Sequence, residues 1–349
     1  MPYEKSGELL QRVNTVFGNL LSAETSDELQ ELAREIMPLM SEHENNISLN
    51  EKAICPASKP YMSWQTKTKL TPEQSKLLED IYTGFVRNGA NLQGDAKEKY
   101  RSLCKELSLL TLQFSENALK ETNDYQLALT DKSQLSGLPE SAVDAAAETA
   151  QEKGVKGWVF TLHAPSYSPF MTYADNRELR RKLYMAYNTK CTHDNACNNL
   201  EIVKKIANVR MEIAQLLGYD NFAEYNLKER MAQNSDAVYK LLNQLLEAYT
   251  PAAQKEYAEV QALARSEEGE NFNLMPWDWS YYSQKLKDRK FNINDEMLRP
   301  YFELSKVKEG VFGLASRLYG ITFKKNPDIP VYHKDVEAYE VFDKDGTYL

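Results

Sequence analysis

Apolar residues recur every three or four positions along most of the chain, which is the spacing of one face of an α-helix. The first stripe predicts a helix over residues 9–21. A second helix is expected to start at Thr25, which has Glu28 at the capping-box position, and to kink or end at Pro38. A third is expected at Thr71-Pro-Glu-Gln74, where a capping threonine, a first-turn proline and a box glutamine occur together. The sequence therefore predicts a mainly α fold.

The same periodicity predicts most of the remaining helices. Their expected ranges are 95–119, 139–153, 176–187, 198–217, 222–231 and 235–265, with two more before Gly320. Gly89 and Gly218 are placed to end helices, and Pro251 is expected to kink or divide the longest one. Residues 163–169 hold two prolines and are predicted to form a turn-rich connection, and residues 267–271 a polar loop.

Three segments have the character of strands. Residues 125–129 alternate between apolar and polar positions, and residues 158–162 form a short β-prone run. We expect these two to pair as a small antiparallel ribbon, with the helix at 139–153 inserted between them. Near the end, residues 336–342 are extended in pattern and residues 343–346 form a hairpin turn signal. Only three residues follow that turn, so an incomplete hairpin is expected, as if the chain were cut there.

Composition narrows the class of protein. The chain has 51 acidic and 42 basic residues, a net charge of −9, which argues against a nucleic-acid partner. No apolar run approaches the roughly 18 residues of a membrane span, and the first residues lack the apolar segment of a signal peptide, so no membrane partner is expected. The cysteines are too few for a disulfide scaffold; Cys104 lies on an apolar stripe and is predicted to be a buried thiol. The four are Cys55, Cys104, Cys191 and Cys197.

Few residues are candidates for chemistry. A helical zinc motif needs two histidines four positions apart, but His43-Glu44 is followed by Ile47 at the second position, which favours an ordinary helix-end histidine. Cys191, His193 and Cys197 could hold a metal in principle, although their spacing is unusual and a polar loop before a helix is favoured. Phosphate-binding loops, dinucleotide fingerprints and nucleophile elbows are missing from the sequence.

An aromatic cluster occupies residues 276–282, Pro-Trp-Asp-Trp-Ser-Tyr-Tyr. One interpretation is a packed helix start with Asp278 as its N-cap, and the other is a channel wall or hinge beside a cleft. Packing is favoured, because aromatic residues at helical spacing more often belong to a core.

Several segments, taken in order, resemble one family. The most specific covers residues 165–187 and begins Pro-Ser-Tyr-Ser-Pro-Phe-Met-Thr-Tyr-Ala-Asp-Asn-Arg. The others are 7–10, 87–92, 207–219, 276–282, 298–302, 318–323 and 330–333. Together they resemble the thimet oligopeptidase family of zinc peptidases, and within it the bacterial branch of peptidyl-dipeptidase (dipeptidyl carboxypeptidase) and oligopeptidase A. The resemblance covers nearly the whole chain.

The resemblance implies a two-lobed helical enzyme whose deep channel admits short unstructured peptides. It also implies zinc held by the two histidines of H-E-x-x-H and a downstream glutamate, with the motif glutamate activating water, the open-site arrangement of catalytic zinc. In the family these residues follow the hairpin at which this sequence stops. No residue of the chain is therefore expected to be catalytic, to bind a cofactor or to ligate a metal, and zinc is expected only in the intact protein.

We accordingly expect a piece of a zinc peptidase, cut at both ends and inactive by itself. Residues 1–163 would form an N-terminal helical region with the ribbon, and residues 164–349 a helical region leading into the catalytic domain. The intact protein would hydrolyse short oligopeptides, with release of C-terminal dipeptides as one form of that activity, in either the cytoplasm or the periplasm. The alternative is a stand-alone helical module that binds peptides or proteins without catalysis, against which the missing repeat period counts.

Overall fold

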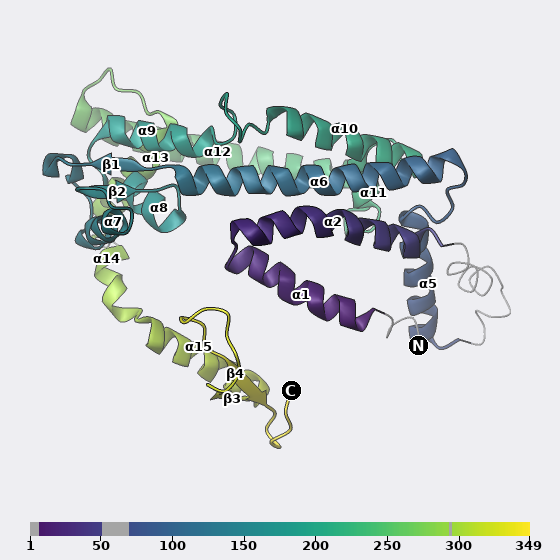
Figure 1. The fold of residues 1–349 in the computed structure, drawn as a ribbon. Coiled ribbons are helices and arrows are strands. Elements are labelled where there is room, and N and C mark those ends of the chain that lie inside the picture. Colours follow the sequence, from purple (N-terminus) through teal and green to yellow (C-terminus); the bar gives the residue numbers. More distant parts are fainter. Residues whose placement is uncertain (1–6, 51–69, 293–294) are drawn as a thin grey trace. The chain divides into compact units, whose positions relative to one another are not determined.

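The computed structural model describes residues 7–50, 70–292 and 295–349 (Figure 1). Cys55 lies outside these residues. The fold is mainly α with two small antiparallel sheets of two strands each, which confirms the predicted class. The chain divides into two compact units, one of residues 32–283 and one of residues 1–31 with 284–349. The expected division between residues 163 and 164 stays a prediction.

Helices make up most of the larger unit. Their bounds are α2 (Asp27–Ser48, which starts in the smaller unit), α5 (Pro72–Arg87), α6 (Asp95–Asp124), α7 (Glu140–Glu152), α8 (Ala164–Tyr173), α9 (Arg177–Asn188), α10 (Leu200–Leu216), α11 (Phe222–Leu227), α12 (Ser235–Glu268) and α13 (Trp279–Phe291), which runs on into the smaller unit. Compared with the predicted ranges, α6 is longer, α11 is shorter, and α12 extends into the predicted polar loop at 267–271.

The helix starts follow local hydrogen bonding. The full capping box of α5 is present: Thr71 Oγ1 accepts from Gln74 N at 3.2 Å and the Gln74 side chain accepts from Thr71 N at 3.1 Å. The predicted cap of α2 is wrong by one residue, because Ser26 Oγ, not Thr25, accepts from Leu29 N at 3.2 Å. Neither α2 nor α12 is divided by its internal proline, Pro38 in α2 and Pro251 in α12.

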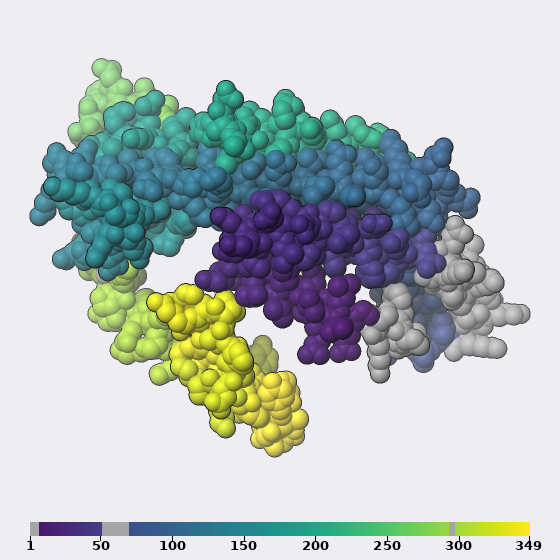
Figure 2. All heavy atoms as spheres, viewed as in Figure 1, coloured from purple at the N-terminus to yellow at the C-terminus, as the bar shows by residue number. Residues whose placement is uncertain are grey.

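One core forms where α6 packs against α10, and the two helices run side by side (Figure 1). In the space-filling view the atoms of these two helices lie against each other without a visible gap (Figure 2). Tyr100 and Leu103 of α6 meet Val209 and Ile213 of α10, and Leu49 completes the cluster. These positions recur at helical spacing, so the apolar stripes predicted from the sequence are the faces that the two helices bury.

The predicted ribbon forms a second core. Strand β1 (Leu127–Leu129) pairs antiparallel with β2 (Trp158–Phe160), and α7 is inserted between them, as expected. The predicted turn-rich connection at 163–169 is wrong, because Ala164 opens the ten-residue helix α8. Pro165 lies in the first turn, where its missing N–H has no intrahelical partner to lose, and burial of Phe170 and Met171 against the ribbon stabilises the helix.

The smaller unit contains α1 (Glu8–Ala23), the short α14 (Asp295–Leu298), α15 (Leu304–Tyr319), β3 (Thr322–Lys325) and β4 (Tyr339–Phe342). Strands β3 and β4 pair antiparallel, a partnership that the sequence did not predict. The predicted turn after β4 is confirmed: Gly346 adopts φ +84° and its N–H donates to Asp343 O at 2.9 Å, and Phe342 then pairs with Tyr348. No helix in the described ranges is both long and apolar enough to cross a membrane.

Candidate functional site

A cavity of about 410 Å³ opens between α7, the end of β2, the start of α8 and the end of α6. Its apolar lining consists of Ala142, Ala145, Ala146 and Pro165. Its polar lining consists of Asn123, Thr149, Lys153, Thr161, His163 and Ser166. The size falls within the range of small-molecule sites, and apolar walls with a few convergent polar groups are typical of them.

The local sequence explains the shape of this cavity. Alanines on one face of α7 leave space that larger side chains would fill, and the helix keeps its stability because alanine is the best helix former. Thr161 and Ser166 are fixed by the chain itself, since Ser166 Oγ accepts from Thr161 N at 3.0 Å and Thr161 Oγ1 accepts from His163 N at 3.4 Å. The hydroxyls thus lie in place between the two ends of the cavity.

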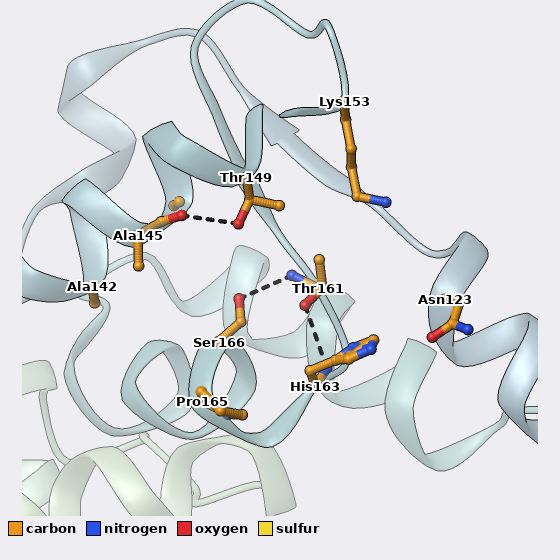
Figure 3. A pocket seen from close by; sticks show the side chains of 10 residues that line it. Asn123, Ala142, Ala145, Thr149, Lys153, Thr161, His163, Pro165 and Ser166 are labelled. Carbon is orange, nitrogen blue, oxygen red and sulfur yellow. Dashed lines mark hydrogen bonds between the residues drawn. The ribbon is translucent and has the colours of Figure 1, made fainter. Parts of the chain in front are cut away.

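The cavity has an apolar end and a polar end (Figure 3). Ala142 and Ala145 lie at one side in this view, whereas Lys153, Asn123 and His163 surround the other. Within the described residues, the ammonium of Lys153, the amide of Asn123 and the imidazole of His163 have no hydrogen-bond or ion-pair partner. None of the lining side chains is acidic. The polar end therefore offers N–H donors and positive charge to a ligand.

A second polar cluster is buried under the aromatic segment. The Asp278 carboxylate is completely buried and accepts from both Arg180 Nη2 at 3.0 Å and Arg177 Nη2 at 2.7 Å, with Met275 N donating to it at 3.0 Å. Asp278 lies directly before α13, where an N-cap was predicted, and its carboxylate binds these arginines from α9. The N-cap role itself stays a prediction. The two arginines therefore connect α9 to the start of α13.

The remaining bonds of Arg180 are also made inside this cluster. Its guanidinium, which is 1% exposed, donates to the carbonyls of Ala174 at 2.7 Å, Asp175 at 3.1 Å and Trp277 at 3.3 Å. The guanidinium stacks on the Tyr281 ring at 4.0 Å, and the Tyr281 hydroxyl donates to Asp175 Oδ1 at 2.8 Å. The Arg180–Asp278 pair is buried and hydrogen-bonded within the protein, so its role is structural. Because Tyr281 packs on this pair, the packing interpretation of the aromatic cluster is favoured over a channel wall at Tyr281.

The cysteine and histidine candidates lie apart from both clusters. Cys191 is buried, its backbone N–H donates to the Glu121 carboxylate, and burial raises the pKa of its thiol to about 11. His193 is exposed and lies 3.7 Å from Glu121, while Cys197 is buried in the loop before α10. In the part of the chain that the structure describes, no three His, Cys, Asp or Glu side chains gather as metal ligands.

Two further expectations concern single residues. Cys104 is only half-buried, so the predicted buried thiol is wrong in degree, although burial still raises the pKa of its thiol. His43 is exposed in the last turns of α2, in line with a helix-end histidine. The cavity residues were missed by sequence reasoning, because they come from four separate elements. The only local signal was the alanine-rich stretch of α7.

Comparison with known proteins assigns the family. Residues 170–349 match the model of peptidase family M3. The chain is 35% identical to oligopeptidase A of Escherichia coli (strain K12) and 34% identical to dipeptidyl carboxypeptidase of the same strain. Each alignment covers 99% of this chain and 51% of the relative. Saccharolysin of Saccharomyces cerevisiae is 27% identical over 86% of this chain and 43% of its own length.

The chain belongs to peptidase family M3, a family of metallopeptidases. The resemblance read from the ordered motifs is confirmed, down to the bacterial branch of oligopeptidase A and dipeptidyl carboxypeptidase. The chain spans about half the length of these curated relatives.

Proposed function

We propose that the whole protein is a zinc-dependent peptidase that hydrolyses short, unstructured oligopeptides. Membership of family M3 is the observation that supports this proposal. The identities to oligopeptidase A and dipeptidyl carboxypeptidase support the substrate class, and the second name suggests release of C-terminal dipeptides as one form of the activity.

Residues 1–349, in this proposal, are a non-catalytic part of that enzyme. The sequence has four histidines, and no two of them are four positions apart. An H-E-x-x-H zinc site therefore has to come from sequence other than these residues. The residues in the described ranges do not fit a zinc site, so no catalytic step is assigned to them.

A second observation supports a larger assembly of which these helices are one part. Leu242, Leu245, Leu246 and Tyr249 form a continuous stripe on α12, and between 36% and 66% of each residue is exposed. Contiguous exposed apolar surface of this kind is typical of an interface. We propose that the rest of the whole protein covers this stripe.

The stripe gives a testable prediction for the isolated chain. The uncovered leucines should drive self-association, and the double variant Leu242→Lys with Leu246→Lys should weaken it about 100-fold, because each buried leucine contributes at least ~1.5 kcal/mol. Sedimentation velocity measures the change. The matched control, Asn243→Lys with Gln244→Lys, adds the same charges off the stripe and should associate like the parent chain. Equal association of all three proteins would contradict the interface.

The proposal as a whole is tested by reading the gene beyond the codon for Leu349. An open frame that encodes H-E-x-x-H supports the peptidase. A stop codon directly after Leu349 would contradict it and would favour the alternative, a helical module that binds peptides without cleaving them.

A further inference from the structure

The cavity beside α7 is lined in part by polar side chains that make no hydrogen bond or ion pair with the described residues. Lys153, Asn123 and His163 come from three different elements and direct cationic or N–H groups to one end of it. In the described ranges none of the three side chains has a hydrogen-bond or ion-pair partner, whereas the buried guanidinium of Arg180 donates to Asp278 and to backbone carbonyls. A polar group without a protein partner beside a cavity is available to a ligand.

We propose that this cavity binds a carboxylate carried on a small apolar body, as in the C-terminal residue of a peptide or a free N-acylated amino acid. The Lys153 ammonium would pair with the carboxylate, with Asn123 and His163 donating hydrogen bonds. The methyl groups of Ala142 and Ala145 would contact the apolar body. The inference goes beyond the proposed peptidase function and does not rest on it, since binding is measured on this chain alone.

Charge and shape both favour a carboxylate over a phosphate. The polar end has one permanent cation, Lys153, and no arginine fork, whereas phosphate sites commonly use arginine or several backbone N–H groups. The opposite end is lined by alanine and proline carbon, which would leave the remaining oxygens of a phosphate without donors. A carboxylate has one oxygen-bearing face and can present carbon to the alanines.

The hydroxyls of Ser166 and Thr161 would provide further hydrogen bonds to the ligand. Ser166 Oγ already accepts from Thr161 N, and Thr161 Oγ1 accepts from His163 N, so each hydroxyl keeps its own proton for donation. Both lie between the polar and apolar ends (Figure 3). A ligand carbonyl directly before the carboxylate-bearing carbon, such as the acyl oxygen of an N-acylated amino acid or the last peptide carbonyl, could accept from them.

The test compares matched probes by calorimetric titration of the chain. N-acetylalanine should bind at least about tenfold more tightly than N-acetylalaninamide, because the amide lacks the charge that Lys153 recognises. Trialanine shows which kind of molecule carries the carboxylate. If it binds as tightly as N-acetylalanine, the cavity binds peptide C-termini. If it binds much more weakly, the cavity binds free small carboxylates. Equal affinity for acid and amide would overturn the proposal, as would inorganic phosphate binding as tightly as N-acetylalanine.

Variants tie the binding to the cavity. Lys153→Gln should weaken N-acetylalanine binding about tenfold or more, whereas Lys156→Gln, an exposed lysine outside the lining, should leave it unchanged. Ala145→Leu should abolish binding by filling the apolar end, and circular dichroism should remain unchanged because leucine is also a good helix former. Equal effects of the two lysine variants, or full binding by Ala145→Leu, would overturn the assignment.

Discussion

Asp278→Asn should destabilise the larger unit by about 3–5 kcal/mol, the usual result of removing one partner of a buried ion pair. The side chain keeps its shape but loses its charge, so Arg180, which is 1% exposed, is left buried without a counter-ion. Arg177, the second partner, is more exposed and loses less. Urea unfolding followed by circular dichroism measures the loss.

The chain offers a matched control in the first turn of α9, which also carries Arg177. Glu178→Gln makes the same chemical change in an exposed pair, where Glu178 lies 3.4 Å from Arg181. Exposed pairs contribute little, so its effect should stay within about 0.5 kcal/mol. Equal losses for the two variants would mean that the buried junction does not hold α9 to the start of α13.

Gly157→Ala should be the most damaging glycine change in the ribbon, with an expected loss of about 3 kcal/mol or more. Gly157 has φ +100°, and a Cβ there would lie 2.2 Å from the carbonyl oxygen of Leu129 on β1. Backbone cannot move away as a side chain can, so overpacking of about 1–3 kcal/mol adds to the conformational strain. Urea unfolding of the variant measures the combined loss.

Gly154→Ala is the control that measures the backbone strain of a positive φ without a steric clash of the added Cβ. Gly154 also has a positive φ, +65°, but a Cβ added there would have no neighbouring atom within 4 Å. Its substitution should cost only about 1–2 kcal/mol, the penalty of a left-handed residue. If Gly154→Ala and Gly157→Ala destabilised the chain equally, the close approach of Gly157 to β1 would be wrong.

Local signals predicted much of this fold, because the elements concerned are defined by neighbouring residues. The Thr71 capping box, the alternation at β1 and the β-prone run at β2 are all readable within a few positions. Strand β3 is different: four residues become a strand only because β4 pairs with them. Likewise α8 begins at an Ala-Pro that looks like a turn, and the buried contacts of Phe170 decide in favour of helix.

The Asp278 cluster and the cavity could not be predicted from the sequence, because both are formed by tertiary packing of distant residues. Arg177, Arg180 and Arg181 lie within five positions of one charged helix, yet only tertiary packing decides that Arg180 points inward to Asp278. Asn123, Lys153 and His163 come from three elements and line one cavity, and their spacing in the sequence does not predict that they lie close together. The family was readable nonetheless, because its motifs are contiguous runs in a fixed order.

A peptidase assay on purified residues 1–349, with added zinc and a short quenched fluorescent peptide, tests whether these residues catalyse hydrolysis. We expect no chelator-sensitive hydrolysis and no tight stoichiometric zinc binding, while oligopeptidase A of Escherichia coli serves as the positive control in the same buffer. Chelator-sensitive turnover that co-purifies with this chain would contradict the claim that these residues are a non-catalytic part of a family M3 peptidase.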